Sequence, residues 1–318
     1  MYNMSESGDY DPGPWKGYSF ASARKVYDAH VGRSYDDAKA SGKDPKDYVP
    51  ESLETKSESP LVIACDVTGS MGDWPATMFS KLPYLDLEGK EYLGKGMEIS
   101  FAAIGDAYCD SYPLQVRQFV GGKSLEKELK GLVIEGGGGG QVQESYDLGA
   151  VYYANNVKMP NAINPIFIFI GDEGLYESVD RDQAKEWARV DFKQRTSTKQ
   201  VLEDLKKKYS VYLIRKPYNT GSGDGMSGTD KNIYSQWASY LGEDHIAILP
   251  NASRVVDVIF GILAKETDRI DYFKKELTER QLKDKGGDKK IAEALKSLHT
   301  IHALPAPVAK KGMSITRR

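Results

Sequence analysis

Cysteine is scarce in this 318-residue sequence, and long apolar runs are missing. The only two cysteines, Cys65 and Cys109, are too few for a disulfide scaffold or a thiolate metal site. The longest apolar stretches, such as 166–170, are the length of a strand and far too short to cross a bilayer. We therefore expect a soluble protein of a reducing compartment, with a cytoplasmic location.

The sequence also has no large excess of positive or negative charge. The 43 Lys and Arg residues nearly balance the 46 Asp and Glu residues, so no overall field favours nucleic acid or an acidic membrane as a partner. The first residues include Ser, Glu, Gly and Asp, and we expect no secretion signal. Hydrophobic residues make up 40% of the chain, which is enough for the core of one large domain with appendages or for two small domains.

Three apolar segments far apart in the sequence each lead to an aspartate. The segments are 61–65, which precedes Asp66, 98–106, which ends at Asp106, and 166–170, which precedes Asp172 after one glycine. Helical patterns alternate with such segments between residues 60 and 265, which predicts a three-layer α/β fold with a doubly wound, mostly parallel, Rossmann-like sheet. Ligands of such sheets collect at the carboxyl ends of the strands, where these aspartates would lie.

The first of these aspartates begins a short pattern of oxygen-bearing side chains, Asp66-Val-Thr68-Gly-Ser70. A carboxylate and two hydroxyls at alternate positions suit Mg²⁺ or Mn²⁺ better than Zn²⁺, which prefers nitrogen and sulfur. The pattern resembles the metal-ion-dependent adhesion site of von Willebrand factor A-type domains, whose common form is Asp-x-Ser-x-Ser. By this resemblance Asp66, Thr68 and Ser70 are metal ligands, and Asp172 matches the aspartate of the family's third loop.

The second ligand loop of that family carries a Gly-Gly-Thr, and here the sequence departs from it. The glycine run 136–140 leads to a helix without any threonine in the loop. Gln141, Glu144 and Ser145 are the possible substitutes, and we choose Glu144 as the ligand because a carboxylate binds a cation most strongly. Gln141 and Ser145 stay as alternative ligands, and Asp106 is a candidate for a place around the ligands.

The resemblance implies a protein-interaction module without catalytic activity. In such a domain Mg²⁺ or Mn²⁺ is held incompletely, and an acidic side chain of a partner protein completes its coordination. Intracellular A-type proteins often work as adaptors beside AAA+ ATPases of the MoxR type, so such an ATPase is the partner expected by analogy. The sequence does not identify the oligomeric state.

The sequence is compatible with two alternative functions. A metal-dependent phosphoester hydrolase could use Asp66 as its nucleophile, but Thr68 stands where such enzymes carry a second aspartate, and no motif supplies a lysine for the phosphate. A structural part of a larger assembly, such as a phage particle, is the other alternative.

The segments outside the sheet domain differ from it in composition. Four regions are expected: an N-terminal arm at 1–59, the A-type domain at 60–265, a helical hairpin at 266–304 and a disordered basic tail at 305–318. Within the arm a helix is expected at 20–29, and Trp15 and Tyr18 are expected to pack locally. The glycine-rich stretch 219–230 predicts a loop on the same side of the sheet as the metal site.

Overall fold

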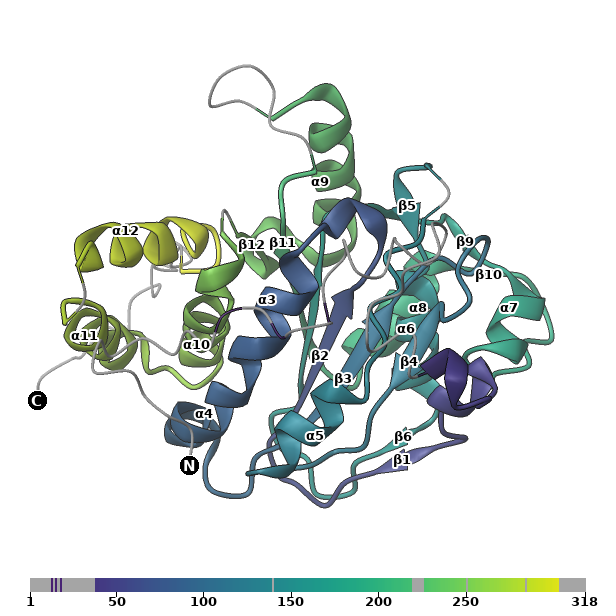
Figure 1. The fold of residues 1–318 in the computed structure, drawn as a ribbon, viewed down its shortest axis with the longest axis horizontal. Coiled ribbons are helices and arrows are strands. Elements are labelled where there is room, and N and C mark those ends of the chain that lie inside the picture. The colour runs from purple at the N-terminus through teal and green to yellow at the C-terminus, as the bar shows by residue number, and fades with distance from the viewer. Residues whose placement is uncertain are drawn as a thin grey trace, which may run out of the picture.

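The structure is a computed structural model, and it describes Gly13, Trp15, Tyr18 and residues 38–138, 140–218, 226–249, 251–283 and 285–302. Its main element is a six-stranded sheet in the order β12-β11-β7-β2-β3-β4 (Figure 1). The strands are β2 (Pro60–Asp66), β3 (Glu98–Ile104), β4 (Leu114–Val116), β7 (Ile166–Gly171), β11 (Ser210–Arg215) and β12 (Ile246–Ile248). All neighbours pair in parallel except β3 and β4, which are antiparallel. The predicted α/β class with a mostly parallel sheet is confirmed.

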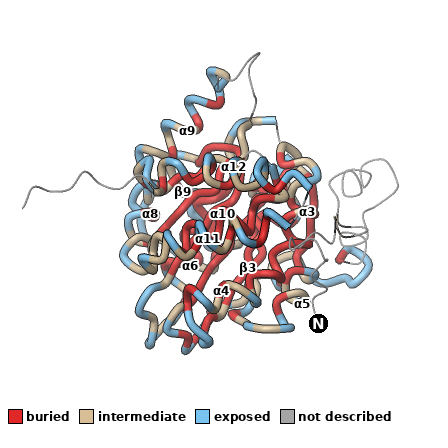
Figure 2. Tube along the Cα trace, turned by 90° about the vertical axis from the view of Figure 1, so that its left-hand side faces the viewer, coloured by how far each residue is buried: buried red, intermediate tan, exposed pale blue. Residues whose placement is uncertain are grey.

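Helices flank the sheet because successive strand residues bury side chains in two separate hydrophobic clusters. Ile63 and Cys65 of β2 belong to one cluster, and Val62 and Ala64 belong to the other. The first cluster includes side chains of α3 (Trp74–Lys81), α4 (Leu85–Leu93), α5 (Ser124–Lys130) and α10 (Val255–Glu266). The second includes side chains of α6 (Tyr146–Asn155), α7 (Arg181–Glu186), α8 (Thr198–Lys206) and α9 (Gly228–Leu241). The central strands are consequently buried along their whole length (Figure 2).

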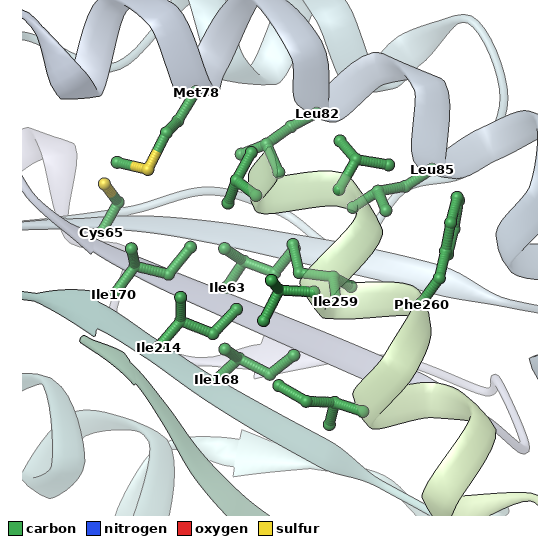
Figure 3. Close-up of a cluster of buried hydrophobic side chains, with 14 of the residues drawn as sticks. Ile63, Cys65, Met78, Leu82, Leu85, Ile168, Ile170, Ile214, Ile259 and Phe260 are labelled. Atoms are coloured by element: carbon green, nitrogen blue, oxygen red, sulfur yellow. The ribbon is translucent and has the colours of Figure 1, made fainter. Parts of the chain in front are cut away.

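The first cluster shows how the apolar runs of the sequence become a core. Ile63, Ile168 and Ile214, from three adjacent strands, lie together beneath Leu82 and Ile259 of the covering helices (Figure 3). All five side chains are at most 1% exposed. Burial of each such side chain stabilises the fold by about 1.5–3 kcal/mol.

The strand order places β2 beside β7 at the middle of the sheet, with β3 on one side and β11 on the other. Chain connections leave β2 and β7 in opposite directions at this point, which is the switch in strand order where open α/β sheets bind ligands. In the register, Cys65 pairs with Ile170, so the ends of β2 and β7 lie side by side. The aspartates that follow these strands therefore come to one edge of the sheet.

In the part of the chain that the structure describes, three short strand pairs lie outside the main sheet. They are β1 (Leu53–Glu54) with β6 (Val157–Lys158), β9 (Ser178–Val179) with β10 (Thr196–Ser197), and β5 (Gln143–Glu144) with β8 (Gly174–Leu175). The last pair joins the loop after the glycine run to the segment after β7.

Two C-terminal helices, α11 (Ile270–Gln281) and α12 (Gly287–Ser297), pack on α10 on one side of the molecule (Figure 1). Leu298 lies so close to Gly261 of α10 that a Cβ on the glycine would be 2.1 Å from Leu298 Cδ1. Arg280 of α11 also donates to the buried Asp257 of α10 at 2.6 Å. The hairpin and the sheet domain thus share one apolar cluster.

Some expected segments lie outside the described residues. They are the helix at 20–29, the basic tail at 305–318 and residues 219–225 of the glycine-rich loop. In the N-terminal arm, the rings of Trp15 and Tyr18 contact each other with centroids 5.8 Å apart, and the Tyr18 hydroxyl donates to the carbonyl oxygen of Lys130 at 3.2 Å. Among the described helices, none combines the length and apolar character needed to cross a membrane.

Candidate metal centre

Asp66 is the last residue of β2, and the turn after it folds back on its carboxylate. Oδ1 of Asp66 accepts hydrogen bonds from the Thr68 backbone N–H at 2.8 Å and from the Thr68 hydroxyl at 2.6 Å. An aspartate that hydrogen bonds the backbone two residues later stabilises a tight turn. The short 3-10 turn η2 (Gly69–Met71) follows and carries Ser70 over the end of the sheet.

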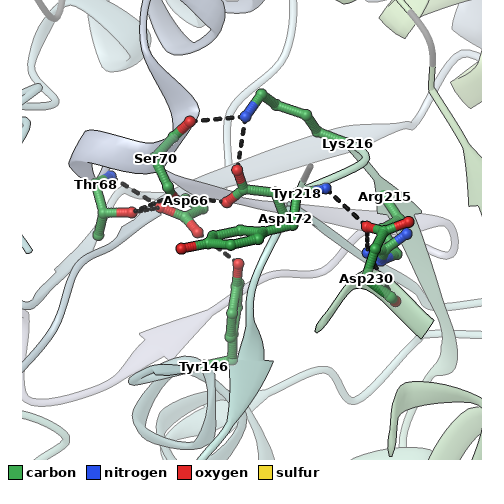
Figure 4. Close-up of polar contacts among 9 residues, drawn as sticks. All are labelled: Asp66, Thr68, Ser70, Tyr146, Asp172, Arg215, Lys216, Tyr218 and Asp230. Carbon is green, nitrogen blue, oxygen red and sulfur yellow. Dashed lines mark hydrogen bonds and ion pairs between the residues drawn. The ribbon is translucent and has the colours of Figure 1, made fainter. Parts of the chain in front are cut away.

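Ser70 connects this turn to the end of β7. Its hydroxyl donates to Oδ1 of Asp172 at 2.8 Å and lies 3.3 Å from the hydroxyl of Thr68 (Figure 4). The structure therefore brings together four of the five predicted ligands, Asp66, Thr68, Ser70 and Asp172, at the carboxyl edge of the sheet. Asp66, Thr68 and Asp172 are at most 1% exposed.

Tyr146, the first residue of α6, reaches the same point from the opposite side. Its hydroxyl donates to Oδ2 of Asp66 at 2.5 Å. The ring passes over Gly171, where a Cβ would lie 1.9 Å from the tyrosine oxygen. A glycine before Asp172 thus makes room for the hydrogen bond to Asp66. The sequence analysis did not find Tyr146, because this contact depends on how α6 packs on the sheet.

Lys216 is a second residue that the sequence analysis missed. Its ammonium group donates to Oδ2 of Asp172 at 2.6 Å and to the carbonyl oxygen of Ser70 at 2.7 Å. Just before it, Arg215 forms a buried ion pair with Asp230 of α9, which fixes the end of β11. The expectation that no lysine stands at the site was wrong, because Lys216 follows β11 as Asp172 follows β7 and the two strands are in register.

Glu144 and its neighbour Glu173 form the other side of the site. Glu144 ends β5 and pairs with Leu175 of β8, which brings it beside Glu173 at the start of that segment. The two carboxyl groups lie within hydrogen-bond reach of each other, and Glu173 also lies within reach of the Ser70 hydroxyl. Both glutamates are at most 4% exposed, and Oε2 of each is a buried atom with no hydrogen-bond partner among the described residues.

A cavity of about 320 Å³ opens between these groups. It is lined by Gly69, Ser70, Gly137, Gly138, Gly140, Gln141, Glu144, Glu173 and Tyr218. The glycine run contacts the turn η2 directly, since the Gly69 N–H donates to the carbonyl oxygen of Gly137 at 2.6 Å. Gly138 has φ +128°, a conformation that side chains rarely adopt, and it lies against Glu144.

Asp106 accepts hydrogen bonds from residues other than those that surround Asp66 and Asp172. It accepts hydrogen bonds from the hydroxyl of Tyr176 at 3.2 Å, from the thiol of Cys109 at 3.2 Å and from the side-chain amide of Gln141. The Ser145 hydroxyl lies 3.5 Å from the same carboxylate. Of Asp106, Gln141 and Ser145, Gln141 is the residue that lines the cavity.

Burial and mutual repulsion raise the pKa values of the carboxyl groups of the site. Burial raises the pKa of Asp66, and the neighbouring charge of Asp172 raises it further. Burial also raises the pKa of Asp172, although Lys216 opposes the shift. The pKa of Glu144 is raised by burial and then by Asp66 and Glu173. A cation placed among these groups would lower all of these pKa values, because it favours the charged forms.

The residues of the site fit a hard divalent cation. Ser70, Glu144 and Glu173 line the cavity and carry hydroxyl and carboxylate oxygens, and Oε2 of each glutamate has no hydrogen-bond partner among the described residues. In the described parts of the chain, no three His, Cys, Asp or Glu side chains form a metal-binding cluster, so hydroxyl groups would have to supply part of the coordination.

No family model and no curated protein matches this sequence. Among solved structures, the chain is similar to the pilus adhesin SpaC from Lactobacillus rhamnosus GG, with a TM-score of 0.45, 11% identity, and coverage of 73% of this chain and 32% of the adhesin chain. The open conformation of that adhesin matches with a TM-score of 0.45 and 10% identity, over 71% of this chain and 31% of that chain. The matched regions span about a third of the adhesin, and the function of this chain is inferred from its own residues.

Proposed function

We propose that this chain is a divalent-cation-dependent protein-interaction module with the three-layer, doubly wound arrangement of A-type domains. The observation that carries the proposal is the meeting of Asp66, Thr68, Ser70 and Asp172 at the switch in strand order, joined by the Ser70–Asp172 hydrogen bond of 2.8 Å. Mg²⁺ or Mn²⁺ is the cation, because the available donors are hard oxygen atoms. When bound, the cation supplies a positive charge that can accept an oxygen ligand from another protein.

The state of the side chains supports binding rather than catalysis. Both carboxylate oxygens of Asp66 accept hydrogen bonds from Thr68 or Tyr146, and these bonds stabilise the carboxylate and weaken it as a nucleophile. The hydroxyl of Ser70 donates to Asp172, whose second oxygen already accepts from Lys216. The ion pair with Lys216 weakens Asp172 as a base for the serine proton, against the effect of burial on its pKa.

An acidic side chain of a partner is the proposed completing ligand, and an AAA+ ATPase of the MoxR type is the proposed partner by analogy with the A-type family. In this role the module works in the cytoplasm as an adaptor. A place in a larger structural assembly is the alternative, and it predicts binding that ignores the cation.

The test is an affinity capture from the native host with Mg²⁺ or with a chelator. The baits are the wild-type chain, Asp66→Ala, and Asp191→Ala as a control at an exposed aspartate paired with Lys185. We expect one identified protein to be retained by the wild type and the control with Mg²⁺, and to be lost with chelator or with Asp66→Ala. Partners that ignore both chelator and mutation would favour a structural role.

A phosphoester hydrolase is the second candidate, and Lys216 is the observation that favours it. A lysine beside the carboxylates could bind a phosphate, although its ammonium already bonds Asp172 and the Ser70 carbonyl. The measurement is release of nitrophenol from p-nitrophenyl phosphate with Mg²⁺. Turnover that disappears in both Asp66→Asn and Lys216→Met would establish the hydrolase and reject the binding module.

A further inference from the structure

The two aspartates of the candidate metal centre are already provided with hydrogen-bond donors. Oδ1 and Oδ2 of Asp66 accept from Thr68 and Tyr146. Oδ1 and Oδ2 of Asp172 accept from Ser70 and Lys216. Every carboxylate oxygen of these two aspartates therefore has at least one lone-pair site occupied by a donor, which leaves fewer sites for a direct bond to a cation.

The two glutamates beside the cavity differ from these aspartates, because each has a carboxylate oxygen that accepts no hydrogen bond from the described residues. Glu144 and Glu173 face each other, each with a buried Oε2 atom that has no hydrogen-bond partner among the described residues. Two carboxylates in this position repel each other unless a proton or a cation lies between them. The two carboxyl groups lie within hydrogen-bond reach of each other, so a shared proton relieves this repulsion when no cation is bound, and a divalent cation would take its place.

The fold holds these glutamates in position from both sides. Strand β5 ends at Glu144 and pairs with β8, whose first residue, Gly174, follows Glu173. The N–H group of Gly174 also donates to the carbonyl oxygen of Val142 at 3.0 Å. The indole of Trp237 donates to the carbonyl oxygen of Glu173 at 2.9 Å, which fixes the backbone of that residue. The pair is thus built into the structure rather than placed on a free surface loop.

Lys216 and Ser70 lie at the boundary between Asp172 and the cavity. Lys216 neutralises Asp172 from one side of Ser70, whereas Glu173 approaches the Ser70 hydroxyl from the cavity. A cation in the cavity would meet two carboxylates and one hydroxyl without displacing the lysine. This is a hard-oxygen donor set of the kind that Mg²⁺ and Mn²⁺ accept, with water in the remaining positions.

We propose that the divalent cation is bound directly by Glu144, Glu173 and Ser70 inside the cavity, while Asp66 and Asp172 position the surrounding turn. Asp66 holds Thr68 and Tyr146, and Asp172 holds Ser70 and Lys216. Glu173 is thereby assigned as a metal ligand. The inference rests on the proposed function in that it requires a cation at this site, but it names different direct ligands from those of the family pattern.

The experiment measures Mn²⁺ binding by isothermal titration of the full chain. The variants are Glu144→Gln with Glu173→Gln, each glutamine change alone, Asp66→Asn and Asp172→Asn. Asp147→Asn is the matched control, because Asp147 is also buried with an unpartnered oxygen but does not line the cavity. Near-ultraviolet circular dichroism establishes that each variant is folded, and each single glutamine variant gives a result even if the double variant does not fold.

We expect the wild type and Asp147→Asn to bind one Mn²⁺ with equal affinity. The double glutamine variant should bind more than about 100-fold more weakly, each single one about 10-fold or more, and the asparagine variants about 10-fold, because they act through hydrogen bonds. Wild-type affinity in both single glutamine variants, with binding lost in Asp66→Asn, would overturn the direct-ligand assignment and leave the metal-dependent module standing. Absence of Mn²⁺ binding by the wild type would overturn both.

A second readout locates the cation. Tyr218 lines the cavity and can transfer excitation to Tb³⁺, a hard-oxygen cation, bound beside Glu144 and Glu173. We expect sensitised Tb³⁺ emission from the wild type to fall at least about twofold in Tyr218→Phe at saturating Tb³⁺. Unchanged emission would place the cation away from the cavity and count against the assignment.

Discussion

The ammonium nitrogen of Lys216 lies 2.6 Å from Oδ2 of Asp172, at the edge of the sheet where the sequence predicts a metal ligand. Asp172 is buried and Lys216 nearly so, with its side chain 15% exposed. The chain therefore carries its own positive charge at this aspartate, and the proposed divalent cation would bind next to the lysine or in its place. Several consequences can be measured.

Replacing Lys216 by methionine should tighten cation binding. The change removes a positive charge beside the site and leaves Asp172 without its partner, so we expect Mn²⁺ affinity to rise about tenfold. Without cation the variant should be less stable than the wild type, because a buried carboxylate is left unpaired. Titration calorimetry and thermal melting measure the two effects, with Lys185→Met, at an exposed lysine, as the control. Weaker Mn²⁺ binding in Lys216→Met would show that the lysine supports the cation.

Replacing Glu144 by threonine should weaken the binding of Mn²⁺ and strengthen the binding of a carboxylate to the bound Mn²⁺. Threonine restores the hydroxyl of the family pattern, and the loss of one carboxylate should weaken Mn²⁺ binding about tenfold. The bound cation would then keep more net positive charge and should bind acetate, a mimic of an acidic partner, more tightly than in the wild type. Acetate titration of the two proteins at saturating Mn²⁺ tests this, and equal acetate affinities would count against it.

Gly137 should be required for the shape of the cavity. A Cβ at this position would lie 1.9 Å from Oδ1 of Asp110, the carboxylate beneath the glycine run. Gly137→Ala should therefore push the run away from Gly69 and weaken Mn²⁺ binding about tenfold without unfolding the sheet. Gly96→Ala is the control, because a Cβ there meets no atom within 4 Å. Equal Mn²⁺ affinities in both variants would argue that the run does not shape the site.

The aspartates at the ends of the apolar strands could be predicted from the sequence. The residues that hydrogen bond to these aspartates could be predicted only in part. Asp66 and Asp172 follow continuous apolar runs, and parallel neighbours bring such ends together. Lys216 follows β11 in the same way, and Arg215 is in register with Gly171, so the same rule applied to basic residues would have found it. Tyr146 could not be predicted, because it reaches Asp66 from a helix through packing over Gly171.

Asp106 shows where the strand-end rule fails. It lies two residues beyond the last residue of β3, and the chain turns there to form the antiparallel strand β4. Its backbone N–H donates to Asp110 at 2.7 Å, which directs the turn away from the switch point. The carboxylate consequently collects Tyr176, Cys109 and Gln141 instead of the groups around Asp66.

The C-terminal hairpin should contribute to the stability of the sheet domain. Leu298 is fully buried against Gly261 of α10, in the same apolar cluster as the central strands. Leu298→Ala should lower the free energy of unfolding by about 3 kcal/mol. Leu282→Ala is the control, since Leu282 is 55% exposed and should cost far less. Urea unfolding measures both, and equal stabilities would show that the hairpin folds independently of the domain.

Asp147 should make the stability of the chain depend on pH in the direction opposite to that of a salt-bridged carboxylate. Burial in the first turn of α6 raises the pKa of Asp147 to about 7, from the ordinary value near 3.8. The folded chain therefore holds a proton there that the unfolded chain has released. The stability from this group is complete below about pH 4 and is lost as the pH rises through about 7.

Asp147→Asn cannot ionise and should escape this loss. Between pH 4 and pH 8 the wild type should lose about 4 kcal/mol of folding stability that the variant keeps. Asp204→Asn, at an aspartate on the surface of α8, controls for the removal of one negative charge. Urea unfolding at pH 4, 6 and 8 gives the three stabilities for each protein. A difference between wild type and Asp147→Asn that stayed constant across this range would mean that Asp147 does not hold a proton in the folded chain.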